Sequence, residues 1–241
     1  MRNKRQIIKN MICGMIGICI CMIATWLSFA YGKGNVTNGY IQSNWAKMSF
    51  LRFEVSLILS SIGITLYYMG INDYIRVFKL SRRKRGARDK SMAKFFEIGA
   101  IAGVVSYLFV QLGYIMMALV YKLLYTTSLM DADIISTTEG MFYYIAIPLL
   151  AFYYISIVAI SISYMYFVYI GRLKVSKICI LFNPLVCLGV GELLKLTKIY
   201  YLVDFASASV LFGMLLMMAA GMVHVSKMPD ERRSRRRRAD E

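Results

Sequence analysis

The hydrophobic positions of this chain fall into six long apolar runs separated by shorter polar segments. The runs cover about residues 11–30, 51–71, 95–125, 141–170, 178–196 and 203–225. An α-helix rises about 1.5 Å per residue, so a run of roughly twenty apolar residues can cross the hydrocarbon core of a bilayer. The pattern predicts an all-α bundle of six transmembrane helices over residues 1–226, followed by a basic, disordered tail at 227–241.

The run at 95–125 is expected to form the central helix, because one of its faces is polar and another consists of small residues, and neither suits contact with lipid. Its polar residues recur at the three-four spacing of one helix face. These are Glu97, Tyr107, Gln111, Tyr114 and Lys122. A second face carries small residues that let a neighbouring backbone come close, namely Gly99, Gly103, Ser106 and Gly113. Both faces should therefore contact protein.

The run at 51–71 carries a second polar stripe. Its members are Glu54, Ser61, Thr65, Tyr68 and Asn72, which the helical spacing keeps on one face. An unpaired polar group is costly in hydrocarbon, so such residues are expected to face protein or water. The simplest arrangement turns both stripes toward a shared interior.

The fifth and sixth runs add polar residues to this interior. Pro184 has no N–H to bond the carbonyl of Ile180, so that carbonyl needs another partner. Discontinuous helices often line binding sites in transporters, although kinked helices without such a role are also common. The candidate ligand-binding residues are therefore Glu54, Ser61, Thr65, Tyr68, Asn72, Glu97, Tyr107, Gln111, Tyr114, Asn183, Glu192 and Asp204. For the acids near the ends of the runs, a helix cap or an ion pair is the competing interpretation.

The first run also fits a cleavable signal peptide, since a basic start leads into an apolar run that ends in Ser28, Phe29 and Ala30. The apolar run is longer than a usual signal core. An uncleaved first helix is the favoured interpretation.

Charge placement changes the meaning of a formal net charge of +16. Most Lys and Arg lie before the first run, between the second and third, between the fourth and fifth, and after the sixth. This is the positive-inside bias, which predicts that both termini are cytoplasmic and argues against a nucleic-acid partner. The basic loop around 82–85 and the run at 232–238 could contact anionic lipid headgroups, although a topology signal alone is the favoured interpretation of the loop.

Few residues suit metal or covalent chemistry. The five cysteines lie inside the apolar runs and the chain has one histidine, so no metal site or cofactor is expected. A lipid-modifying enzyme that uses Glu54, Glu97 or Glu192 stays open, because acid–base catalysis needs only a positioned carboxyl group.

Short motifs resemble an uncharacterised family of bacterial six-helix membrane proteins, known as a domain of unknown function. They are Arg52, Leu66-Tyr67 and Gly70 in the second run, Phe95-Phe96 in the third, and Phe182-Asn183-Pro184-Leu185 in the fifth. The resemblance covers Arg52 to the end of the sixth run. It implies this topology and a bacterial source, but no activity. Asn72, Tyr107 and Gln111 stand where that family has histidines, so an activity that needs those histidines would be absent.

These observations lead to a hypothesis about function. We expect a multi-pass protein of a bacterial plasma membrane that holds a small polar or lipidic ligand in the bundle, as a transporter or a ligand-binding protein, and is not an enzyme. The alternatives are a carboxylate-dependent lipid-modifying enzyme and a scaffold that works through its basic surfaces.

Overall fold

The computed structural model describes residues 4–30, 33, 35, 37–38, 41–80, 86–127 and 130–228. The basic loop at 82–85 and the predicted tail beyond residue 228 lie outside the described residues. The part of the chain that the structure describes is all-α apart from a small hairpin of two two-residue strands, β1 (Thr37–Asn38) and β2 (Ile41–Gln42). The all-α part of the predicted fold class is thus confirmed.

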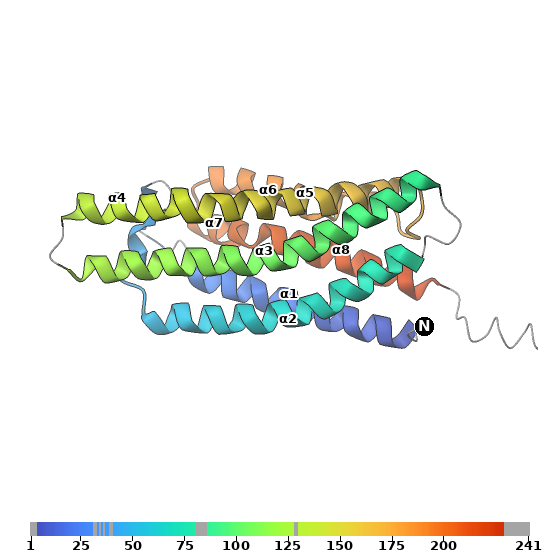
Figure 1. Ribbon diagram of the computed structural model, residues 1–241, viewed down its shortest axis with the longest axis horizontal. Coiled ribbons are helices and arrows are strands. Elements are labelled where there is room, and N and C mark those ends of the chain that lie inside the picture. The colour runs from blue at the N-terminus through green and yellow to red at the C-terminus, as the bar shows by residue number, and fades with distance from the viewer. Residues whose placement is uncertain are drawn as a thin grey trace, which may run out of the picture.

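The helices run lengthwise along an elongated bundle (Figure 1). They are α1 (Lys4–Phe29), α2 (Phe50–Leu80), α3 (Ala87–Tyr125), α4 (Asp131–Met141), α5 (Ile147–Tyr169), α6 (Pro184–Leu196), α7 (Tyr200–Ser207) and α8 (Ser209–Ser226). Short 3₁₀ segments, Ser43–Ala46 and Lys177–Leu181, precede α2 and α6.

A π-helical turn, Phe142–Ala146, joins α4 to α5, so that the two form one continuous rod (Figure 1). Pro148 explains this turn, because it has no N–H to bond the carbonyl of Tyr144.

Within the described residues, five helices are long and apolar enough to cross a membrane: α1, α2, α3, the α4–α5 rod and α8. The predicted run at 178–196 differs from these. It is broken at Asn183 into the 3₁₀ segment Lys177–Leu181 and the 13-residue α6. The break follows from Pro184, which can begin a helix but cannot continue one.

The two ends of the described chain meet at one end of the bundle, which we call the termini end. There the Lys4 ammonium donates to the carbonyls of Ser226 at 2.6 Å and Met228 at 2.8 Å. Five full-length helices alone would leave the chain ends at opposite ends of the bundle. The broken segment from Lys177 to Leu196 therefore returns the chain to the opposite end of the bundle, which we call the far end, before α7 and α8 begin (Figure 1).

The termini end is closed by aromatic packing. The rings of Phe78 in α2 and Phe96 in α3 stack with centroids 4.1 Å apart, and Phe167 of α5 meets Phe78 edge-on at 5.0 Å. All three side chains are buried. This cluster packs α2, α3 and α5 against one another between the centre of the bundle and the termini end.

Glycines bring helices into backbone contact. A Cβ added at Gly14 of α1 would lie 2.6 Å from the Cα of Gly70 in α2, and one added at Gly17 would lie 2.5 Å from the carbonyl oxygen of Gly63. Between α3 and α5, a Cβ at Gly99 would lie 2.8 Å from that of Ala159. The predicted small-residue side of the third helix is thus confirmed as a close helix contact.

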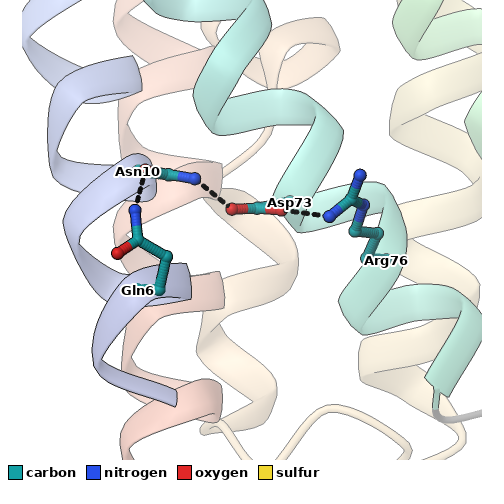
Figure 2. A network of polar contacts seen from close by, with 4 residues as sticks. All are labelled: Gln6, Asn10, Asp73 and Arg76. Atoms are coloured by element: carbon teal, nitrogen blue, oxygen red, sulfur yellow. Dashed lines mark hydrogen bonds and ion pairs between the residues drawn. The ribbon is translucent and has the colours of Figure 1, made fainter. Parts of the chain in front are cut away.

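A buried carboxylate links α1 to α2 near the termini end (Figure 2). Asp73 is fully buried; it accepts from the Asn10 amide at 2.6 Å and pairs with Arg76 at 3.3 Å. The Gln6 amide donates in turn to Asn10 at 3.1 Å. Because a buried charge needs partners, these contacts help to fix the pairing of the two helices.

Gly14→Ala is expected to lower the free energy of unfolding by about 1–3 kcal/mol, because the new methyl group overlaps the α2 backbone. Thermal unfolding of the purified protein in detergent measures it. Gly189→Ala is the matched control: within the described residues, an added Cβ there meets no atom of another element within 4 Å. That change should stabilise α6 by about 0.5–1 kcal/mol. A loss of equal size for both variants would contradict the close contact.

Asn10→Ala removes one donor from the buried Asp73 carboxylate and is expected to destabilise the protein by about 1–3 kcal/mol. Gln6→Ala is the control, since Gln6 is exposed and does not contact the carboxylate directly. If the two variants unfold at the same temperature, Asn10 does not support Asp73.

Candidate functional site

A cavity of about 500 Å³ lies in the half of the bundle toward the far end. Its walls come from six helices: α1, α3, α5, α6, α7 and α8, with Gln42 of β2 at one edge. Its volume is within the range of small-molecule sites, which run to about 300–1,000 Å³.

One wall of the cavity is polar and held rigidly. The Tyr107 hydroxyl of α3 lies 2.9 Å from Thr25 Oγ1 and donates to the Cys21 carbonyl at 3.1 Å, both on α1. One helical turn further on, Gln111 Nε2 donates to Ser28 Oγ at 2.8 Å and to Ser56 Oγ at 3.1 Å. We call Thr25, Tyr107 and Gln111 the polar wall.

The amide of Gln111 leaves one acceptor available. Its nitrogen is engaged by two hydroxyls from α1 and α2, and only 2 % of the residue is exposed. Its Oε1 accepts from no donor in the described part of the chain. A carbonyl oxygen of this kind can accept a hydrogen bond from a ligand hydroxyl, amide or ammonium group.

The remaining lining is mainly apolar and aromatic. The side chains are Phe29 of α1, Val110 and Tyr114 of α3, Leu150, Tyr153 and Tyr154 of α5, Leu188 of α6, and Val203, Ala206, Val210 and Leu211 of α7 and α8. Apolar walls around a few fixed polar groups are typical of ligand sites.

Charged residues line the cavity where α6 nears its end. Lys195 pairs with Glu192 at 2.7 Å, and both side chains are exposed. Ser207 of α7 also lines the cavity, and its hydroxyl donates to the Asp204 carbonyl at 2.6 Å. The cavity thus runs from a buried polar wall to an exposed ion pair.

Four of the predicted site residues meet at this cavity: Tyr107, Gln111, Tyr114 and Glu192. Three of them lie on the side of α3 that faces the cavity, whereas Glu97 and Lys122 of the same stripe are not among the lining residues. Whether any of them contacts a ligand stays a prediction.

The predicted interior stripe of the second helix is placed differently. Glu54, Ser61, Thr65 and Tyr68 are exposed on the outside of α2, so the expectation that they share the interior is wrong. The inward side of α2 is taken by Gly63 and Gly70, which touch α1. The hydroxyls need no interior partner, because Ser61 donates to the Leu57 carbonyl at 3.0 Å and Thr65 to the Ser61 carbonyl at 2.9 Å.

The other predicted residues have structural roles or lie elsewhere. Glu97 pairs with Lys79 of α2 near the termini end. Asn72 and Asp204 are half-buried and are not among the cavity-lining residues.

Asn183 is fully buried and organises the helix break. Its Oδ1 accepts from the N–H groups of Leu185 at 2.9 Å and Val186 at 3.1 Å, which caps α6. Its Nδ2 donates to the Ile180 carbonyl at 2.6 Å. The expectation that this carbonyl needs another partner is therefore confirmed.

The sequence pattern did not single out Thr25, Tyr153, Lys195 or Ser207, all of which line the cavity. The first helix had one usable signal: Thr25 and Ser28 lie three residues apart in an otherwise apolar stretch, on the face that meets the polar stripe of α3. No sequence signal marked Lys195 or Ser207, because their position at the cavity depends on how α6 packs.

The described residues contain no group of three His, Cys, Asp or Glu side chains that could hold a metal ion. The one histidine, His224, lies by the α5–α6 connection, where its Nδ1 accepts from the backbone N–H of Lys174 at 2.8 Å. It is not among the residues that line the cavity.

Comparison with known proteins identifies the family. Residues 1–228 match a family of unknown function (DUF6796), and the chain belongs to this family. The match covers the first helix as well as the part from Arg52 onward that carried the resemblance. No curated protein matches the chain, and neither does any solved structure.

Asn183→Ala is expected to lower the free energy of unfolding by about 1–3 kcal/mol, because it removes the α6 cap and the partner of the Ile180 carbonyl. Asn183→Asp should recover part of this loss, since a carboxylate caps the helix but cannot donate to Ile180. Asn72→Ala is the control at a half-buried asparagine without this role. Equal midpoints of thermal unfolding for Asn183→Ala and Asn72→Ala would contradict the assigned role.

Proposed function

We propose that this protein is a non-enzymatic, multi-pass membrane protein that binds a small amphipathic ligand in the cavity between α3, α5, α6 and α8. The observation that carries the proposal is the cavity itself, which combines a fixed polar wall with apolar sides. A ligand with a polar group and an apolar body would satisfy both.

Hydrogen bonding at Gln111 favours a ligand site over a packed helix contact. Buried polar groups in proteins nearly always form hydrogen bonds, and the free-energy cost of leaving one unpaired is greatest where no water is present. The Gln111 amide nitrogen donates to two serine hydroxyls, and its Oε1 accepts no hydrogen bond from the described residues. A ligand donor at this point would complete the network.

The placement of carboxylates favours binding over catalysis. Of the acids considered for lipid chemistry, Glu192 lines the cavity, whereas Glu54 is exposed on α2 and Glu97 pairs with Lys79. Glu192 is itself exposed and paired with Lys195. Its charge is therefore already balanced by a neighbouring ammonium group at the solvent-exposed edge of the cavity. The scaffold hypothesis leaves the cavity unexplained.

We further propose that the chain crosses the plasma membrane of a bacterium six times, with both termini in the cytoplasm. The contact of Lys4 with the end of α8 supports an even number of crossings, with α6 and its 3₁₀ segment forming the fifth. Basic residues near the termini end, including Arg5, Arg76, Lys79 and Arg172, fit a cytoplasmic side.

Thiol labelling in lipid nanodiscs tests the cavity. In a background without the native cysteines, Tyr114→Cys and Ser207→Cys should react with N-ethylmaleimide several-fold faster than Ser60→Cys, because the first two line the cavity. Ser60 is a buried serine of α2 outside the lining and is the matched control. Equal, slow labelling at all three positions would show a packed interior and overturn the proposal.

A further inference from the structure

A second hollow adjoins the cavity on the outside of the bundle. It measures about 340 Å³ and lies between α5 and α6, lined by Tyr154, Ile157, Val158, Leu185, Leu188 and Glu192. Three of these residues, Tyr154, Leu188 and Glu192, also line the cavity. We call this hollow the α5–α6 groove. Apart from Glu192 and the Tyr154 hydroxyl, its side chains are apolar.

The groove exists because α6 packs on α8 more closely than on α5. A Cβ added at Gly191 would lie 2.3 Å from Ser209 Oγ, and one at Gly213 of α8 would lie 2.6 Å from the Cα of Pro184. On the other side of α6, Gly189 is exposed and meets no other element within 4 Å among the described residues. The fully buried Asn183 holds the start of α6 in this position.

In the proposed six-span topology the groove lies at the depth of the hydrocarbon. Val158 falls near the middle of α5, and Leu185 lies in the first turn of α6. Neighbouring side chains on α5, Ile155 and Ile162, are exposed and apolar, as expected of a lipid-facing surface. At this depth an apolar groove is filled by hydrocarbon chains and not by water.

We infer that the ligand is an acyl-chain lipid, whose chain lies in the α5–α6 groove and whose head group reaches the polar wall of the cavity. This inference rests on the proposed function and adds the substrate class and the route of entry. The shared residues Tyr154, Leu188 and Glu192 join the two hollows, so one amphipathic molecule can occupy both. Its head group carries a hydroxyl or ammonium donor for Gln111 Oε1.

Photo-crosslinking tests the inference with the full-length protein in nanodiscs. The probe is phosphatidylglycerol that carries a diazirine halfway along one acyl chain, diluted in unlabelled phosphatidylglycerol and phosphatidylethanolamine. After irradiation, mass spectrometry should find adducts on the groove residues Val158 and Leu185 several-fold more often than on Ile155, which is more exposed but outside the groove.

Val158→Trp fills the groove and should lower the adducts on Leu185 several-fold. Ile155→Trp, one turn away on the same helix, is the matched control and should leave them unchanged. Since Val158 and Ile155 are both exposed, neither variant should disturb the fold. Thermal unfolding of both variants checks this.

Labelling of Ser207→Cys, repeated beside the crosslinking, separates the two claims. Suppose that Ser207→Cys labels fast, but that adduct frequency follows side-chain exposure and is unchanged in Val158→Trp. The proposed cavity is then supported, and the acyl-chain inference is overturned. If Ser207→Cys resists labelling, the proposed function itself fails. Fast labelling together with groove adducts that Val158→Trp removes supports both.

Discussion

The structure depends on three hydrogen bonds made by the side chain of Asn183 at a helix break within the bundle. They cap the first N–H groups of α6 and satisfy the Ile180 carbonyl that Pro184 leaves without its helical donor. Unpaired backbone groups are costly in hydrocarbon, so the break persists only with such a partner. Because α6 begins against Gly213 of α8, it packs more closely on α8 than on α5, which it meets in its first turn, where the Leu185 N–H donates to Ser161 Oγ at 3.1 Å. Both the cavity and the α5–α6 groove follow from that position.

The two halves of the bundle are built differently. Toward the termini end, stacked Phe78 and Phe96, the buried Asp73 and the contact of Lys4 with α8 hold the helices together. Toward the far end, six helices enclose a cavity of about 500 Å³. One half of the bundle is therefore closely packed, and the other half contains the cavity. In this member of a family of unknown function, the cavity is the candidate ligand site.

Much of the fold could be predicted from periodicity, and much of the site could not. Runs of apolar residues identified the helices, and the spacing of Tyr107, Gln111 and Tyr114 identified the inward face of α3. The same reasoning failed for Ser61 and Thr65, because their hydroxyls bond carbonyls of their own helix and tolerate a lipid-facing position. Close contact through Gly63 and Gly70 decided how α2 is turned. Lys195 and Ser207 join the site only through the packing of α6, α7 and α8, which no local pattern encodes.

The most direct test is an experimental structure of the protein in lipid nanodiscs, at a resolution that shows bound lipids. We expect an elongated density that starts beside Gln111, passes Leu188 and leaves the bundle between α5 and α6. A structure in which α5 and α6 are in continuous contact, with side chains filling the space beside Gln111, would contradict it.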